Sequence, residues 1–309
     1  MLFRSAGNDI IWNPVNLSSI DGGTGTDTIA LTGTSASLNA LADSKLVNVE
    51  AIDASTASAS VVIALGLQTE GFTITGSAYA DTITGGFGVD TIVAGAGDDT
   101  IIGVSGLDTI DGGDGRDTVR ISATSAALNS LADSQLANVE VVSAANAAAG
   151  VTINLSKQSD GFSIVGSTYA SSLTGSTGND NIQGGNGNDT INGGLGNDTL
   201  TGGLGQDRFV FNSAITGGNN VDVITDFNPV NDSLQLSSAV FSGLAVSNGQ
   251  LAASAFALDT ATGSAAQVVY DSHTGALYYD SNGSGAGGST QFAVLQGAPN
   301  LTEKQIFVV

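Results

Sequence analysis

A period of nine residues organises this sequence. Residues 184–210 contain three consecutive nonapeptides of the pattern G-G-x-G-x-D-x-U-x, where U is an apolar residue. Residues 76–120 hold five further copies of varying quality, and residues 22–30 hold one more. A fixed short period of this kind predicts a repeat architecture in which each unit contacts only its neighbours.

The aspartates of the repeats share a single phase. The U residue follows each aspartate by two positions, and that position stays mostly apolar between the repeat blocks, as at Leu38, Val47 and Leu65. We therefore expect the intervening stretches to continue the same coil without metal-binding turns. The motif aspartates, all at multiples of nine, are Asp9, Asp27, Asp81, Asp90, Asp99, Asp108, Asp117, Asp180, Asp189, Asp198 and Asp207.

The two halves of the nonapeptide predict different local structures. The half G-G-x-G-x-D predicts a sharp turn, because glycine permits positive φ angles and leaves backbone carbonyl oxygens accessible. The half x-U-x predicts one short strand whose middle residue faces inward. Two nonapeptides then make one coil, with two parallel sheets enclosing the U residues. Each turn stacks on the turn that lies two nonapeptides away along the chain.

Stacked turns of this kind favour calcium. Ca²⁺ takes six to eight oxygen ligands, which aspartate carboxylates and turn carbonyls supply. The alternative, that aspartate only caps glycine-rich turns through hydrogen bonds, explains a single motif but not eleven in one phase. We expect about six ions, between the pairs Asp81/Asp99, Asp99/Asp117, Asp90/Asp108, Asp180/Asp198, Asp189/Asp207 and Asp9/Asp27. Ser171 stands where the series requires another aspartate, so a site shared with Asp189 is expected to be lost or weakened.

Charge narrows the possible partners. The chain has 29 Asp and Glu against 7 Lys and Arg, a net charge of −22, which argues against binding to nucleic acid or to an anionic membrane. Its lack of cysteine excludes disulfides and zinc–thiolate sites, and no apolar run is long enough for membrane insertion.

Without metal, stacked carboxylates repel one another, so we expect the calcium-free array to be largely disordered.

A larger duplication lies over the short repeat. Residues 31–75 recur as 121–165 at an offset of ten nonapeptides, and the shared elements include Asn48-Val49-Glu50 and Asn138-Val139-Glu140. The sequence therefore predicts five segments. They are N-terminal rungs in 1–75, a first calcium-binding block in 76–120, calcium-free rungs in 121–165, a second calcium-binding block in 166–211, and a C-terminal β module in 212–309.

The period stops after residue 211. Val268-Val269-Tyr270 and Leu277-Tyr278-Tyr279 flank a turn and predict a hairpin, and residues 291–295 predict another strand. The elements D-x-F-x-F at 207–211, D-V-I-T-D-F at 222–227 and A-L-Y-Y-D-S-N-G-S-G at 276–285 resemble the end of serralysin-type and other RTX proteins. Together with the nonapeptides, the resemblance covers residues 76–309.

The resemblance to RTX proteins implies a fold and a cellular destination. The fold is an all-β parallel β-roll or β-solenoid, capped by a C-terminal mixed β module. The destination is extracellular, through an uncleaved signal in the last fifty or so residues that type I secretion machinery recognises. Gln305 precedes Ile306 where such tails often have an acidic residue, which is a departure from the pattern. The repeat register is already present at Gly7-Asn8-Asp9, so we expect a C-terminal part of a longer protein, with a natural start as the alternative.

Catalytic patterns are weak. His273 is the only histidine and lies in a predicted exposed turn, and neither H-E-x-x-H nor G-x-S-x-G occurs. Trp12 is expected to pack against the first rung. We therefore expect no enzyme activity and favour a calcium-binding region of a secreted surface, matrix or adhesin-like protein, with polysaccharide as a candidate partner. The alternatives are an export module of an RTX metalloprotease, lipase or epimerase, and a fragment of a pore-forming toxin.

Overall fold

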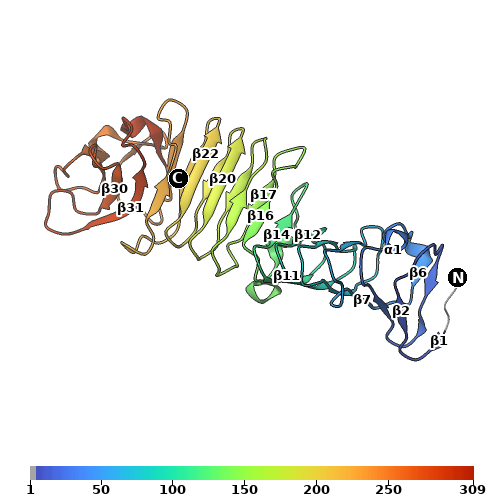
Figure 1. The fold of residues 1–309 in the computed structure, drawn as a ribbon. Helices are drawn as coiled ribbons and strands as arrows, with labels where there is room; N and C mark the ends of the chain where they lie inside the picture. Colours follow the sequence, from blue (N-terminus) through green and yellow to red (C-terminus); the bar gives the residue numbers. More distant parts are fainter. Residues whose placement is uncertain (1–4) are drawn as a thin grey trace. The chain divides into compact units, whose positions relative to one another are not determined.

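The computed structural model describes residues 5–309, and its regular secondary structure consists mainly of short strands (Figure 1). The first four residues of the predicted segment 1–75 lie outside this range. Contacts divide the chain into a first unit, with residues up to 121 and 125–143, and a second unit, with residues 122–124 and 144–309. Parallel strands stack within each unit into a β-solenoid, which confirms the predicted fold class.

The first unit is a coil of parallel strands. Its first sheet runs, in spatial order, β15 (Leu136–Ala137), β13 (Thr109–Asp114), β11 (Thr91–Ala96), β9 (Thr73–Thr75), β7 (Ala51–Asp53), β5 (Thr28–Ala30) and β2 (Ile10–Trp12). The second runs β8 (Val62–Ala64), β10 (Thr82–Thr84), β12 (Thr100–Ile102), β14 (Thr118–Arg120) and β16 (Val141–Ser143). Short pairs join β1 (Ser5–Ala6) to β4 (Gly23–Thr24) and β3 (Ile20–Asp21) to β6 (Leu46–Val47).

The middle residue of each strand forms the core. Ile83 pairs with Ile101, and Ile92 pairs with Ile110, so each rung here contains two nonapeptides, as predicted. These side chains are almost completely buried, and the residues on either side of them are more exposed. The alternation follows from strand geometry, in which successive side chains point to opposite faces.

The nine-residue phase breaks in the intervening stretch. Ile29 pairs with Ile52, and Ile52 pairs with Ile74, so both of these rungs are longer than two nonapeptides. The expectation that Leu38, Val47 and Leu65 continue the ladders is therefore wrong, because the ladder residues are Ile52 and Ile63. The two longer rungs together add the length of one nonapeptide, which restores the phase at Ile74 and hides the break from a sequence count.

Short helical turns occupy the longer rungs. Leu38 and Leu128 lie in these turns and are buried. Within residues 5–309, no helix has the length and apolar character needed to cross a membrane. The helical segments of these rungs are α1 (Ala36–Asn39) and the 3-10 turns η1 (Asp43–Lys45), η2 (Leu128–Ser130) and η3 (Asp133–Gln135). The C-terminal module contains two further 3-10 turns, η4 (Ala253–Ala255) and η5 (Glu303–Gln305).

The second unit continues from a regular coil into a mixed sheet. One sheet runs β17 (Thr152–Asn154), β19 (Ser172–Thr174), β21 (Thr190–Asn192), β23 (Arg208–Phe211), β25 (Ser233–Leu236), β32 (Ile306–Val308), β27 (Gln250–Leu251) and β26 (Val246–Ser247). The other runs β18 (Ser163–Val165), β20 (Asn181–Asn186), β22 (Thr199–Leu204), β24 (Asp222–Ile224), β31 (Ser289–Leu295), β30 (Ala276–Asp280), β29 (Gln267–Tyr270) and β28 (Phe256–Leu258).

The C-terminal module extends both sheets of the second unit. β24 and β25 pair in parallel with the last repeat strands, β22 and β23. The predicted hairpin is present as antiparallel β29 and β30, and the predicted strand at 291–295 lies within β31. Phe292 packs edge-on against Phe211 and Phe241, so aromatic contacts join the module to the last repeat strand. Trp12 remains 58% exposed, which contradicts the expectation that it packs against the first rung.

Candidate metal centre

Hydrogen bonds link the motif aspartates of stacked turns into ladders. The Asp81 N–H donates to Asp99 Oδ1 at 2.7 Å, and the Asp99 N–H donates to Asp117 Oδ1 at 2.8 Å. Bonds of the same kind join the other predicted partners, so the structure brings each predicted pair together. These remaining bonds run from Asp9 to Asp27, from Asp90 to Asp108, from Asp180 to Asp198 and from Asp189 to Asp207.

The ladders are buried. Apart from Asp9, which is half-buried, each motif aspartate is at most 3% exposed. Burial disfavours the charged carboxylate. It raises the pKa of Asp99 and of Asp198 to about 7 and the pKa of Asp189 to about 6. Hydrogen bonds from backbone N–H groups lower these pKa values, but burial has the larger effect. The folded, metal-free protein therefore binds a proton at these positions more tightly than an exposed aspartate does.

One set of turns leaves a carboxylate oxygen without a partner. We call a turn open when the aspartate Oδ2 accepts no hydrogen bond and the glycines two and four residues before it have positive φ angles. In turn 112–117, for example, Gly113 and Gly115 have φ angles of 96° and 147°, and Asp117 Oδ2 is buried and unpartnered. Among the described residues, the open turns are 22–27, 94–99, 112–117, 184–189, 193–198 and 202–207. Asp9 also has an unpartnered Oδ2.

A second set of turns is closed, because a backbone N–H of the same turn occupies Oδ2. The Gly86 N–H donates to Asp90 Oδ2 at 2.8 Å, and the Ser176 N–H donates to Asp180 Oδ2 at 2.7 Å. Ser77 and Ser105 supply the corresponding N–H groups to Asp81 and Asp108. A closed turn satisfies both carboxylate oxygens from protein alone and leaves less capacity for a metal ion.

Aspartates with an unpartnered Oδ2 stack in pairs at three places in residues 5–309. Both aspartates keep an unpartnered Oδ2 in the pairs Asp9/Asp27, Asp99/Asp117 and Asp189/Asp207. Parallel pairing can continue into the turn at such places, as where Gly95 lies opposite Gly113. The other predicted pairs, Asp81/Asp99, Asp90/Asp108 and Asp180/Asp198, each include at least one closed turn.

Two of the closed turns stack on segments that lack the nonapeptide motif. Turn 85–90 has the full letters G-G-F-G-V-D, yet it stacks on the non-glycine segment 68–70, and the Phe87 N–H donates to the Gln68 carbonyl at 2.9 Å. Turn 175–180 stacks on Gln158 in the same way. Each of these turns packs in the closed shape on a rung that lacks the nonapeptide motif. The Ser171 N–H donates to Asp189 Oδ1. Ser171 therefore lies next to Asp189 at the end of the ladder, at the position where the nine-residue series requires an aspartate.

Four acidic residues outside the motif extend the ladders. The Asp27 N–H donates to Glu50 Oε2, and the Asp117 N–H donates to Glu140 Oε2, each at 2.7 Å. The Asp198 and Asp207 N–H groups donate to Asp222 Oδ1 and Asp232 Oδ1, at 3.2 and 3.0 Å. Sequence reasoning missed these residues as site residues because they lie outside the nine-residue phase. The only available signal was the recurrence of Asn-Val-Glu at 48–50 and 138–140.

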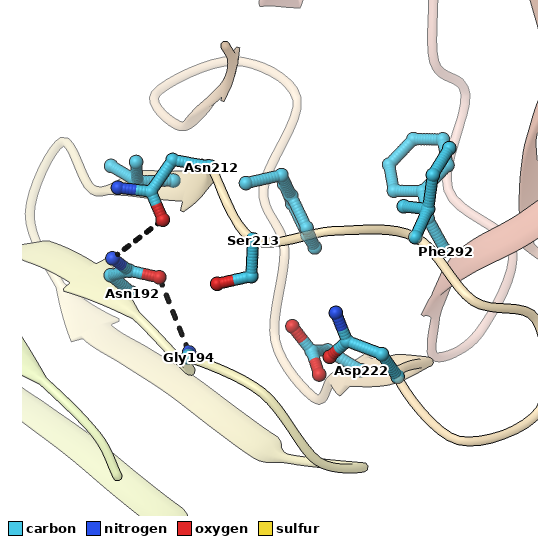
Figure 2. Close-up of a pocket in the computed structure, with 10 residues that line it drawn as sticks. Asn192, Gly194, Asn212, Ser213, Asp222 and Phe292 are labelled. Atoms are coloured by element: carbon cyan, nitrogen blue, oxygen red, sulfur yellow. Dashed lines mark hydrogen bonds between the residues drawn. The ribbon is translucent and has the colours of Figure 1, made fainter. Parts of the chain in front are cut away.

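Asp222 lies where the last repeat meets the C-terminal module. It is 5% exposed, and burial, reinforced by the charge of Asp198, raises its pKa to about 8. Figure 2 shows its carboxylate at the lower edge of a small pocket, below Ser213 and to the side of Gly194. A hydrogen bond from Asn192 Nδ2 to Asn212 Oδ1 at 3.0 Å lies on the other side of the same pocket. The pocket has a volume of about 10 Å³, so it has no room for an organic ligand.

The residues of the open turns fit Ca²⁺. A buried carboxylate oxygen without a partner is costly unless a cation or proton satisfies it. Hard oxygen donors without nitrogen or sulfur ligands are the set that Ca²⁺ prefers. The close stacking also requires glycine, because a Cβ on Gly113 would lie 1.9 Å from the Gly95 carbonyl oxygen. The aspartates of the open turns and the adjacent backbone carbonyls are therefore the groups that would hold the ion.

A separate cluster on the C-terminal module has a different character. His273 Nδ1 lies 3.6 Å from Oδ1 of both Asp259 and Asp271, but the histidine side chain is 82% exposed. Both Oδ1 atoms already accept backbone N–H groups of the surrounding turn. The hydrogen bonds from Ser272 lower the pKa of Asp259, and those from Thr274 and His273 lower that of Asp271. The cluster is an ordinary hydrogen-bonded turn.

Comparisons with known proteins identify the repeats. No curated protein matches the chain. Among solved structures, the chain is similar to the solution structure of the AlgE6R3 subunit from the Azotobacter vinelandii mannuronan C5-epimerase. The sequence identity is 27%, the match covers 45% of this chain and 77% of that chain, and the TM-score is 0.25. The family model of the RTX calcium-binding nonapeptide repeat matches residues 73–101, 93–120 and 174–209. Residues 73–120 and 174–209 of this chain are therefore RTX calcium-binding nonapeptide repeats of the hemolysin type.

Proposed function

We propose that the chain is a calcium-dependent structural module of a secreted protein, in which Ca²⁺ bound between open turns drives the folding of the solenoid. The unpartnered Oδ2 atoms of stacked, buried aspartates carry this proposal. Within the described residues, the strongest sites lie between the stacked aspartates Asp9/Asp27, Asp99/Asp117 and Asp189/Asp207. The pairs that include a closed turn would bind more weakly, because part of their carboxylate capacity is already used.

Linkage explains how calcium would control folding. The metal-free chain carries a net charge of −22 and orders glycine-rich turns at an entropic cost. A ligand that binds only the folded state stabilises it to a degree set by the ratio of its concentration to its dissociation constant. At low calcium the chain would stay unfolded and able to pass through an exporter, and at extracellular calcium it would fold.

The test is a calcium titration of the full chain followed by far-UV circular dichroism. We expect coil in a chelator, and β signal that appears with millimolar Ca²⁺ but not with the same concentration of Mg²⁺. Asp117→Asn should raise the calcium concentration at half-folding, and Glu70→Gln, at an exposed position outside the ladders, should not. A chelated chain with a full β spectrum would contradict the coupling of folding to calcium.

The destination and role of the module extend the same proposal. Residues 212–309 would carry the type I export signal, so their deletion should abolish export of a fused reporter from a host with a matching exporter. The folded module would act outside the cell as a non-catalytic scaffold in a surface, matrix or adhesin-like protein, with polysaccharide as the partner class. Hydrolase and epimerase assays of this chain should show no turnover with or without Ca²⁺, and reproducible turnover would contradict a purely structural role.

A further inference from the structure

The Asn-Val-Glu segments 48–50 and 138–140 lie at the ends of two aspartate ladders and have the same geometry. Asn48 and Asn138 both have a left-handed backbone, with φ angles of 53° and 51°. Their side-chain Nδ2 atoms donate to Asp21 Oδ1 and Asp111 Oδ1, at 2.8 and 2.7 Å. The repeated strain and the repeated hydrogen bond show that each segment is held in one fixed conformation.

Each segment supplies the carboxylate that a following turn would supply. Between two open turns, the Asp189 N–H donates to Asp207 Oδ1 at 2.9 Å. At the ends of the ladders, Glu50 Oε2 and Glu140 Oε2 accept the equivalent N–H groups of Asp27 and Asp117 at 2.7 Å. The glutamate therefore takes the place of the next aspartate, although it lies further along the chain than the nine-residue phase would put it.

Each segment also supplies the carbonyl oxygen of a following turn. In the open pair, a Cβ placed on Gly184 would lie 2.5 Å from both Gly202 O and Asp189 Oδ2, so these oxygens converge beside Gly184. Beside Gly112, the corresponding distances are 2.0 Å to Asn138 O and 2.6 Å to Asp117 Oδ2.

The earlier copy repeats this convergence. Beside Gly22, the distances are 1.9 Å to Asn48 O and 2.6 Å to Asp27 Oδ2. A backbone carbonyl and an aspartate oxygen therefore approach the same space at both ladder ends.

An unpartnered buried oxygen faces each of these places. Asp27 and Asp117 are both 0% exposed, and the Oδ2 atom of each accepts no hydrogen bond from residues 5–309. The Asn carbonyl, the aspartate Oδ2 and the glutamate carboxylate thus form an oxygen set at the end of the ladder, of the kind that Ca²⁺ prefers.

We propose that Asn48–Glu50 and Asn138–Glu140 act as terminal half-turns, each completing a calcium site against the last open turn of its ladder. Glu50 and Glu140 would be calcium ligands contributed from outside the nonapeptide motif, and each would add one ion to the array. This inference rests on the proposed calcium-binding function of the open turns. It also gives the duplicated segments a reason to preserve an acidic residue that is out of phase with the repeats.

The test compares substitutions that separate the two roles of the glutamate. Glu140→Gln keeps an oxygen that accepts the Asp117 N–H but removes the charge, whereas Glu140→Ala removes both. The matched changes at residue 50 and the double variant complete the series, and Glu70→Gln is the control. Bound calcium is counted on the full chain by equilibrium dialysis and elemental analysis, with circular dichroism at saturating Ca²⁺ as a check of folding.

The ligand role and the hydrogen-bond role give different results. If the glutamates are ligands, each Gln variant loses one ion, the double Gln variant loses two, and the Ala variants lose the same numbers. Gln variants that bind as many ions as the unsubstituted chain, while Ala variants lose stability, would overturn the proposal and leave a hydrogen-bonded cap. An unsubstituted chain that binds no calcium would instead refute the proposed function itself.

Discussion

Replacing a single buried aspartate should stabilise the metal-free protein and weaken the calcium-bound one. Asp99 lies in the centre of a ladder, 1% exposed, with Oδ1 accepting the Asp81 N–H and Oδ2 unpartnered. Asparagine keeps the Oδ1 acceptor and the size of the side chain but carries no charge. The substitution Asp99→Asn therefore changes the electrostatics of the site more than its packing.

The magnitude follows from the pKa of Asp99, which burial raises from 3.8 to about 7. A difference of about three units corresponds to about 4 kcal/mol of penalty for the ionised carboxylate in the folded, metal-free state at pH 8. Asparagine removes this penalty but buries an NH₂ group, which costs about 1–3 kcal/mol if it stays unpaired. The metal-free fold should therefore gain about 1–3 kcal/mol.

The assay measures both states at pH 8. In a chelator, trimethylamine N-oxide drives the metal-free chain to fold, and Asp99→Asn should lower the osmolyte concentration at half-folding. In Ca²⁺ titrations without the osmolyte, the same variant should raise the calcium midpoint, because it removes a charged ligand. A variant that is less stable without metal and has an unchanged calcium midpoint would refute the assignment of Asp99 as a buried, metal-linked carboxylate.

Three further predictions follow from burial and packing. When trimethylamine N-oxide keeps the metal-free chain folded, calcium binding at pH 7 should release protons, because burial raises the pKa of Asp99 and Asp198 in that state to about 7, and the metal-free fold should gain stability as the pH falls from 8 towards 4. Calorimetry in buffers of different ionisation enthalpy measures the release, and binding without proton transfer would contradict it. Gly113→Ala should destabilise the calcium-bound fold by more than the ~1–2 kcal/mol that its φ of 96° costs an L-residue, because its Cβ would overlap a backbone oxygen. Gly249→Ala, at a φ of 80° with no atom within 4 Å, should cost only the backbone term, and equal losses in thermal unfolding would disprove the stacking argument. Phe209→Ala, at a fully buried ladder position, should cost about 3–5 kcal/mol in chemical unfolding, and a loss below about 1 kcal/mol would contradict its place in the core.

The hairpin and the regular rungs could be predicted because their signals are local. Apolar residues at a fixed nine-residue spacing determine which side chains lie between the sheets, as at Ile92 and Ile110. The turn between Tyr270 and Leu277 likewise lies between two apolar runs that pair as β29 and β30. In both cases the partner of each residue is set by a short, regular separation along the chain.

The rungs of irregular length could not be predicted in the same way, because their deviations from the nine-residue period cancel. Ile52 is displaced from the nine-residue phase, yet Ile74 returns to it, so the count along the sequence is uninterrupted. The place of Ile52 in the sheet is set by its pairing with Ile29 and Ile74 rather than by its place in the nine-residue series. Only the packed coil shows that Leu38 lies in a helical turn instead of a ladder strand.

The sequence alone determined the kind of fold and the kind of ligand: a parallel solenoid with glycine-rich turns and aspartates suited to Ca²⁺. The tertiary structure decided which turns are open. Turns 85–90 and 184–189 share the motif letters, yet the first is closed against Gln68 and the second is open against its neighbour. The physical reason is that a turn in a solenoid adopts the shape that its neighbouring rung can pack against. For the same reason, Glu50 and Glu140 join the ladders only once the coil has folded.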